Sequence, residues 1–188
     1  GSTEVGKLIG HACMDNMTRI TLELGGKSPV IVLDDCDPAT AAAGAANAIF
    51  FNHGQVCCAG SRLYVHKSMF DRVVADVADQ AAQLTLGHGL DPSAQMGPLV
   101  SQEQMERVCS YIDIGRSQGA EVVTGGARSG QRGYFVQPTV MTGVQHDHRV
   151  AREEIFGPVL VAMPYDDLDE VAAWANDCLL YTSPSPRD

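Results

Sequence analysis

The chain has 188 residues, enough for one sizeable hydrophobic core or for one domain with a piece of another. Its composition, 45% hydrophobic and 19% charged, is that of a globular protein, and no apolar run approaches the roughly 20 residues that a membrane span requires. The net charge of −10 argues against nucleic acids and anionic membranes as partners. Six scattered cysteines without a CxxC pair favour free thiols in the cytoplasm over disulfides or a zinc site.

The first fifty residues show helical and strand patterns in turn. Ser2 can cap a helix whose apolar positions share one face, and an Ala-rich helix is expected over residues 38–52. Residues 19–24 alternate strictly between apolar and polar, which predicts a strand that Gly25-Gly26 ends. Residues 29–33 form a continuous apolar run, which is typical of a buried parallel strand.

The middle of the chain continues this order. A strand is expected over residues 63–66 and an amphipathic helix over about 68–84. A long loop with several glycines follows. We then expect a helix over 101–117 and a short strand over 121–124.

The last third begins with a glycine-rich loop over residues 125–133. Residues 134–136 and 138–141 read as extended, residues 158–163 as an apolar strand and residues 166–177 as a helix. Because strands alternate with helices, we expect an α/β fold, with a mainly parallel sheet and flanking helices.

The segment from Phe51 to Arg62 places two cysteines on a polar, glycine-rich bend between a helix and a strand. On such a bend the backbone N–H groups are free to hold an oxyanion, which a nucleophilic cysteine requires. Spacing alone does not choose between Cys57 and Cys58. The remaining cysteines lack this setting and are interpreted as structural: Cys13, Cys36, Cys109 and Cys178.

Carboxylates stand beside glycines at two further places. Glu23 lies among apolar neighbours just before Gly25-Gly26, where a partly desolvated carboxylate can act as a general base. It can equally be a solvated surface group. Glu153 and Glu154 precede Phe156, Gly157 and Pro158, so they form either a plain loop or a place where a carboxylate meets ribose hydroxyls.

Two weaker signals complete the set. The small residues Gly1 and Ser2 open a helix, and helix amino ends bind anions. His146-Asp147-His148 contains metal-binding residue types, but no third ligand is evident and a solvated loop is the better interpretation. We therefore expect no metal.

Together these stretches resemble the NAD(P)-dependent aldehyde dehydrogenase family. Residues 21–29 are similar to the family's glutamate signature, residues 51–62 to its cysteine signature, and residues 153–159 to its cofactor-ribose segment. Glu23 lies 34 positions (57 − 23) before Cys57, and Glu154 lies 97 positions (154 − 57) after it, in the family's register. Three motifs in the right order and at the right spacing identify a family more specifically than any one motif does.

The resemblance implies a role for each residue. Cys57 is the nucleophile that forms a thiohemiacetal and then a thioester, and its backbone N–H supports the oxyanion. Glu23 activates the water that hydrolyses the thioester. The implied cofactor is NAD, with NADP open, and its implied contacts are Gly1, Ser2, Leu24, Glu154 and Phe156.

The resemblance also bears on the extent of the chain. Family chains are well over twice as long, so we expect an internal segment that is inactive on its own. Residues 1–23 would be a remnant of the dinucleotide-binding domain, residues 24–177 a truncated catalytic domain, and residues 178–188 a foreign tail. The parent would be a cytoplasmic homodimer or homotetramer acting on an aldehyde, closest in look to the phenylacetaldehyde and general aldehyde dehydrogenases.

Two alternatives stay open. In the acylating branch of the same superfamily, a second thiol or a phosphate takes the acyl group instead of water. A non-catalytic relative would have a structural or interaction role. Glu23 disfavours the first, and the intact set of Cys57, Glu23 and Glu154 disfavours the second.

Overall fold

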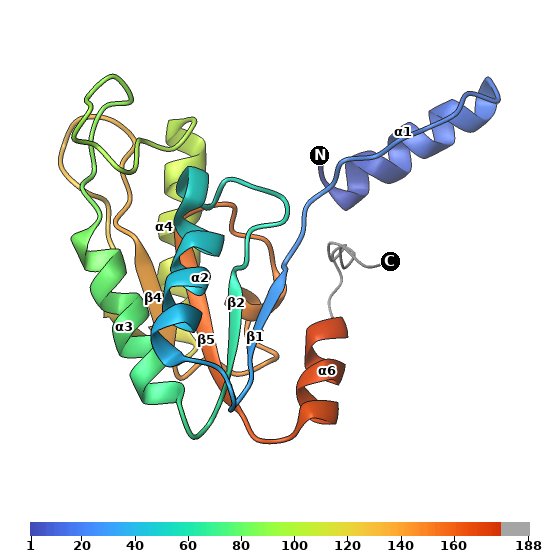
Figure 1. The fold of residues 1–188 in the computed structure, drawn as a ribbon. Helices are drawn as coiled ribbons and strands as arrows, with labels where there is room; N and C mark the ends of the chain where they lie inside the picture. The colour runs from blue at the N-terminus through green and yellow to red at the C-terminus, as the bar shows by residue number, and fades with distance from the viewer. Residues whose placement is uncertain (178–188) are drawn as a thin grey trace.

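The computed structural model describes residues 1–177, so the expected foreign tail and Cys178 lie outside the described residues. Within this part, five strands form one sheet in the order β1-β2-β5-β4-β3 (Figure 1). Strand β3 pairs antiparallel with β4, and all other neighbours are parallel. The expected α/β fold with a mainly parallel sheet is confirmed. The strands are β1 (Pro29–Val32), β2 (Arg62–His66), β3 (Glu121–Thr124), β4 (Thr139–Thr142) and β5 (Val159–Tyr165).

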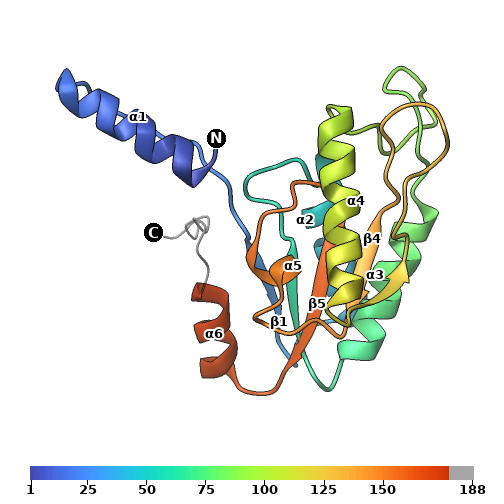
Figure 2. The ribbon, with the colours of Figure 1, turned by 180° about the vertical axis from the view of Figure 1, so that it is seen from behind.

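Helices cover both faces of the sheet. Helices α2 (Pro38–Phe50) and α3 (Phe70–Gln83) lie on one face, while α4 (Gln102–Ser117) and the short α5 (Arg149–Arg152) lie on the other (Figures 1 and 2). Helix α6 (Leu168–Asn176) packs on the α4 face, with Trp174 against Tyr64 of β2 at 6.3 Å between ring centroids.

The apolar runs of β2 and β5 are buried on both sides, which explains their pattern. Strand β1 is at the edge of the sheet and its Ile31 is 38% exposed, so the burial expected for residues 29–33 is only partial. In β5, Leu160 and Ala162 belong to the core under α2 and α3, whereas Val159, Val161 and Met163 belong to the core under α4. Successive side chains of a strand point to opposite faces, so a strand between two helical layers needs apolar residues at every position.

Several helices begin at a polar side chain that caps their amino end. Ser2 accepts from the Val5 N–H at the start of α1 (Thr3–Asp15), as expected. Asp37 caps α2, Ser101 caps α4 and Asp167 caps α6 in the same way. These bonds satisfy backbone N–H groups that have no partner within the helix.

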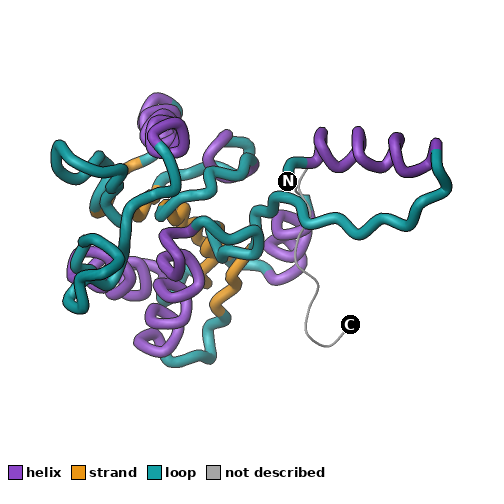
Figure 3. Tube along the Cα trace, turned by 90° about the horizontal axis from the view of Figure 1, so that it is seen from above, coloured by secondary structure: helices purple, strands orange, loops and turns teal. Residues whose placement is uncertain are grey.

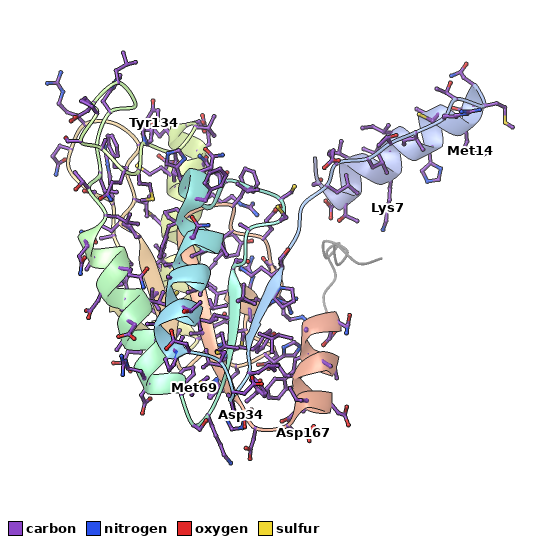
Figure 4. All side chains as sticks on the ribbon, viewed as in Figure 1. Lys7, Met14, Asp34, Met69, Tyr134 and Asp167 are labelled. Carbon is purple, nitrogen blue, oxygen red and sulfur yellow. The ribbon has the colours of Figure 1, made fainter. Side chains whose placement is uncertain are left out.

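Residues 1–24 form an arm that stands away from the sheet. Helix α1 points outward, and residues 16–24 run back beside it to the body (Figures 1 and 3). The arm is closed at its base, where the Gly1 amino group donates to the Glu23 carbonyl at 2.8 Å. Side chains along it, including Lys7 and Met14, project into open space (Figure 4). Its apolar positions are therefore exposed, with Leu8 at 69% and Met17 at 83%.

Two expectations about elements need correction. Residues 19–24 are extended but form no strand, because the described segment beside them is helix α1, which cannot pair with a strand. The helix expected over 38–52 ends at Phe50, since Asn52 and His53 adopt left-handed backbone angles with φ of 47° and 61°. Residues 134–136, which were expected to be extended, belong to no strand and contribute one isolated bridge, between Val136 and Arg128.

Candidate active site

The topology brings the sequence motifs to one edge of the sheet. Strands β1, β2 and β5 are adjacent and parallel, so the segments that precede them meet at the same edge. Those segments carry Glu23, Cys57 and Glu154. The opposite edge is marked by Asp34 and Asp167, which follow β1 and β5 and are both at the bottom of Figure 4.

A cavity of about 410 Å³ opens at the edge where the motifs meet. Cys57 lines it, whereas Cys58, which is also exposed, is not among its lining residues. Gln104 and Arg107 complete the wall. The lining includes every residue expected for the nucleophile, the base and the cofactor: Gly1, Ser2, Glu23, Leu24, Cys57, Glu154 and Phe156.

Cys57 sits on a tight turn whose backbone donors are available. The Ala59 N–H bonds to the Val56 carbonyl at 3.0 Å, which places Cys57 and Cys58 at the two central positions. Within residues 1–177, the N–H groups of both cysteines donate no hydrogen bond. The bend therefore has the free donors that the sequence predicted.

The chain just before this turn is held in place by close packing. Gly54 has a φ of +67°, and a Cβ there would overlap the Gly157 carbonyl. The Gln55 side chain accepts from the Val100 N–H at 3.1 Å. The cysteine turn is thus packed against the segment that carries Phe156 and tied to the loop before α4.

Glu154 is fixed in the cavity by the glycine pair. Its Oε1 accepts from the Gly26 N–H at 3.0 Å. A Cβ at position 25 would overlap Oε2 of Glu154, so only glycine allows this approach. The Glu154 carbonyl accepts from Arg107 at 2.7 Å.

Glu153, the neighbouring carboxylate, has a different environment. Arg149 donates to both of its oxygens at 2.8 Å, and Tyr111 donates at 2.6 Å. These bonds, from Arg149 above all, lower the pKa of Glu153 to about 2. Burial and the same hydrogen bond raise the pKa of Tyr111. Glu153 is therefore an ion-pair partner, and Glu154 alone of the two lines the cavity.

Phe156 has a strained backbone. Its φ of +58° is unusual for a bulky residue, and such strain persists only where the surroundings impose it. The Gln104 side-chain amide donates to the Ile155 carbonyl at 3.0 Å and to the Phe156 carbonyl at 2.8 Å. Gln104 therefore holds the bend that turns Phe156 toward the cavity.

Glu23 differs from the expectation in one respect. The residue is exposed, so the described part of the chain does not desolvate its side chain. The arm stands apart from the body, which leaves the segment before Gly25 open to water on one side (Figure 1). Its position in the same cavity as Cys57 agrees with the sequence.

Gln104 and Arg107 were not found from the sequence. They lie three residues apart on α4 and so share a face of the helix, beside the buried Met105 and Val108. A polar pair at this spacing is also what an ordinary solvated helix shows. Only the position of α4 against residues 154–156 reveals their place in the cavity.

The histidine pair of the sequence analysis lies elsewhere. His146 bonds to Asp177 at 3.0 Å and stacks on Trp174, and His148 accepts from the Gln145 N–H. In residues 1–177 no group of three His, Cys, Asp or Glu side chains is placed to hold a metal ion. None of the described helices is long and apolar enough to cross a membrane.

Comparison with known proteins gives relatives along nearly the whole chain. Residues 1–180 match the aldehyde dehydrogenase family. The phenylacetaldehyde dehydrogenase of Pseudomonas fluorescens is 50% identical over 178 residues, and a mitochondrial aldehyde dehydrogenase of Leishmania tarentolae is 48% identical over 180 residues. These alignments cover 94% and 95% of this chain, respectively.

A solved structure agrees with the sequence relatives. The NAD+ complex of an aldehyde dehydrogenase from Bacillus cereus superposes with a TM-score of 0.92 at 47% identity, over 95% of this chain and 36% of that chain. The chain likewise spans 36% of the length of the curated relatives it matches. The match over residues 1–180, together with this likeness in structure, shows that the chain belongs to the aldehyde dehydrogenase family.

Proposed function

We propose that the chain carries the nucleophile and the nicotinamide end of the cofactor site of an NAD-dependent aldehyde dehydrogenase, which oxidises an aldehyde to a carboxylic acid. The observation that carries the proposal is the single cavity lined by Cys57 and Glu23 together with Glu154 and Phe156. The solved aldehyde dehydrogenases of Bacillus cereus and Staphylococcus aureus with NAD+ bound support the choice of cofactor.

The residues of the cavity fit NAD. Arg107 brings a positive charge and the amino end of α1 presents backbone N–H groups, both of which suit a pyrophosphate. Glu154, held by Gly26, can accept from ribose hydroxyls, and Phe156 offers a ring beside it. When bound, NAD supplies the hydride acceptor.

The chain's own residues then act in order. The Cys57 thiolate attacks the carbonyl carbon of the aldehyde, and the free N–H of the turn donates to the resulting oxyanion. Loss of hydride from that carbon, for which bound NAD would be the acceptor, leaves a thioester on Cys57. Glu23 takes a proton from water, and the water oxygen attacks the thioester carbon. The C–S bond then breaks, which releases the carboxylic acid and restores the Cys57 thiolate.

A second hollow supports a hydrophobic aldehyde as the substrate. It measures about 490 Å³ and is lined in part by residues 50–53, which precede the cysteine turn, with Phe50, Phe51 and Leu84 as its large apolar members. Phe51 is 68% exposed there. The relative from Pseudomonas fluorescens, named for phenylacetaldehyde, agrees with this substrate class.

The arm supports the proposed division of the chain. Its separation from the body and its exposed apolar residues are consistent with residues 1–23 belonging to a cofactor domain and residues 24–177 to the catalytic domain. Five free cysteines among the described residues agree with a reducing, cytoplasmic setting. Homodimer or homotetramer formation stays a prediction.

One experiment with four proteins tests the chemistry. A protein of the relatives' length that contains this segment, and its Cys57→Ala, Cys58→Ala and Glu23→Gln variants, are assayed for NADH formation and for acyl-enzyme by intact mass. Cys57→Ala should lower kcat about a thousandfold or more and form no acyl-enzyme. Cys58→Ala, the matched control, should stay within about threefold.

Glu23→Gln should keep a first burst of NADH and accumulate the thioester, since only hydrolysis loses its base. Normal turnover by Cys57→Ala would overturn the proposal. An unchanged steady-state rate in Glu23→Gln, with no acyl-enzyme, would remove the base from the mechanism.

A further inference from the structure

Arg62 is a fully buried cation close to the cysteine turn. It opens strand β2, five positions after Cys57, and its residue exposure is 0%. Burying a guanidinium is costly unless its donors are satisfied. Within residues 1–177 its hydrogen-bond acceptors are all uncharged oxygen atoms, which take the place of the usual carboxylate.

Those oxygens come from two separate parts of the fold. On one side, Nε donates to the Lys27 carbonyl at 2.8 Å. On the other, Nη1 donates to the Trp174 carbonyl at 3.1 Å and Nη2 to the Ala175 carbonyl at 2.9 Å. The last carbonyls of a helix lack partners within it and carry its negative partial charge, so the end of α6 suits a cation. The Tyr64 hydroxyl accepts at 3.3 Å.

The Lys27 carbonyl belongs to the segment that forms one wall of the cavity. Gly25 packs against Glu154 with no room for a Cβ, and the Gly26 N–H donates to the same carboxylate. A shift of the chain at Lys27 would therefore move the Gly26 donor relative to Glu154. The Arg62 N–H adds a bond from β2 to the Ser28 carbonyl at 3.2 Å.

We propose that Arg62 is a positioning residue of the cavity, which ties the Gly25–Lys27 segment to the carboxyl end of α6 and so sets the place of Glu154. The importance of Arg62 for catalysis rests on the proposed function, whereas its role in holding the Gly25–Lys27 segment does not depend on that function. Arginine suits the role because its planar fork reaches three carbonyls in fixed directions, which the single ammonium of lysine cannot do.

The test measures the Gly26–Glu154 bond in the 188-residue chain without cofactor. Amide hydrogen exchange is followed by NMR for Gly26 and for Val161 in β5, in the unmodified chain and in Arg62→Lys. The matched control is Arg72→Lys, an exposed arginine that pairs with Asp76 on α3. In Arg62→Lys the Gly26 amide should exchange about tenfold faster or more, while Val161 exchange changes less than about threefold.

Equal acceleration at Gly26 and Val161 would show a role in global stability only and would overturn the proposal, as would unchanged exchange at Gly26. Should Arg62→Lys fail to fold, the unmodified chain gives a second measurement. The Arg62 Nε–H and the Gly26 N–H should then exchange with the same dependence on urea, and clearly different dependences would overturn the link. Because no cofactor is used, a failed NAD role for Glu154 would leave these results unaffected.

Discussion

Gly25 and Glu154 come from segments far apart in sequence, and their close approach shapes the cavity. The carboxylate occupies the volume that a Cβ at position 25 would need, and the next N–H donates to it. The site thus depends on an absent side chain as well as on present ones. The same reasoning separates the two cysteines, because Cys57 lines this cavity and Cys58 does not.

Replacing Gly25 should therefore be costly. Gly25→Ala forces Glu154 or the backbone to move, and overpacking of this kind costs about 1–3 kcal/mol of unfolding free energy. Gly44→Ala is the control, because a Cβ at that helical position meets nothing within 4 Å. It should stabilise α2 by about 0.5–1 kcal/mol. Urea unfolding of the 188-residue chain measures both, and equal effects of the two changes would contradict the steric argument.

The main elements follow from short-range patterns because the central strands of the parallel sheet are buried on both faces. The continuous apolar runs at β1 and β5 and the amphipathic pattern of α3 carry that information locally. The order of the strands in the sheet is not encoded in such local patterns. That β5 lies beside β2, and so brings Glu154 near Cys57, depends on contacts about a hundred residues apart. Sequence patterns hold no direct sign of such contacts.

The errors have the same origin. Residues 19–24 have the period of a strand, but a period does not supply a neighbour to pair with. Helix α5 has four residues, too few to show a period at all. Gln104 and Arg107 lie on a helix that was predicted correctly, yet their function comes from the segment packed against it. The site motifs could be predicted, and their supporting residues could not.

Glu153, at the carboxyl end of α5, forms an ion pair whose strength should depend on pH. Glu153 accepts from Arg149 of α5 and from Tyr111 of α4, and its pKa is lowered to about 2. A carboxyl with a lowered folded-state pKa stabilises the fold above its unfolded pKa of about 4.3. That stability should disappear as the pH falls toward 2.

Glu153→Gln should accordingly be less stable than the unmodified chain at pH 7, by about 1 kcal/mol or less because the pair is partly exposed. The difference should shrink between about pH 4.5 and pH 2 and vanish below that. Thermal unfolding across this range measures it. Asp113→Asn, at the exposed Arg116 pair on α4, is the control. A difference that is constant with pH would contradict the assignment.

At the scale of the whole molecule, the cavity is built from two parts with very different support. The body has two cores, one on each face of the sheet, whereas the arm exposes most of its apolar residues. Cys57, Glu154 and Phe156 belong to the body, while Gly1, Ser2 and Glu23 belong to the arm. An isolated helix as short as α1, with 13 residues, is marginal in water. The arm side of the cavity therefore lacks the stability of the body side.

This contrast predicts how the 188-residue chain behaves on its own. Cys57 should react with iodoacetamide, because the turn that carries it is packed into the body and its thiol is exposed. NAD at about 1 mM should leave the Tm within about 1 °C, since a ligand stabilises only when its concentration exceeds Kd. No aldehyde-dependent NADH should form. A protein of the relatives' length that contains the segment is the positive control. A Tm rise of several degrees with NAD, or NADH formation that Cys57→Ala abolishes in the short chain, would show that the arm completes the site unaided.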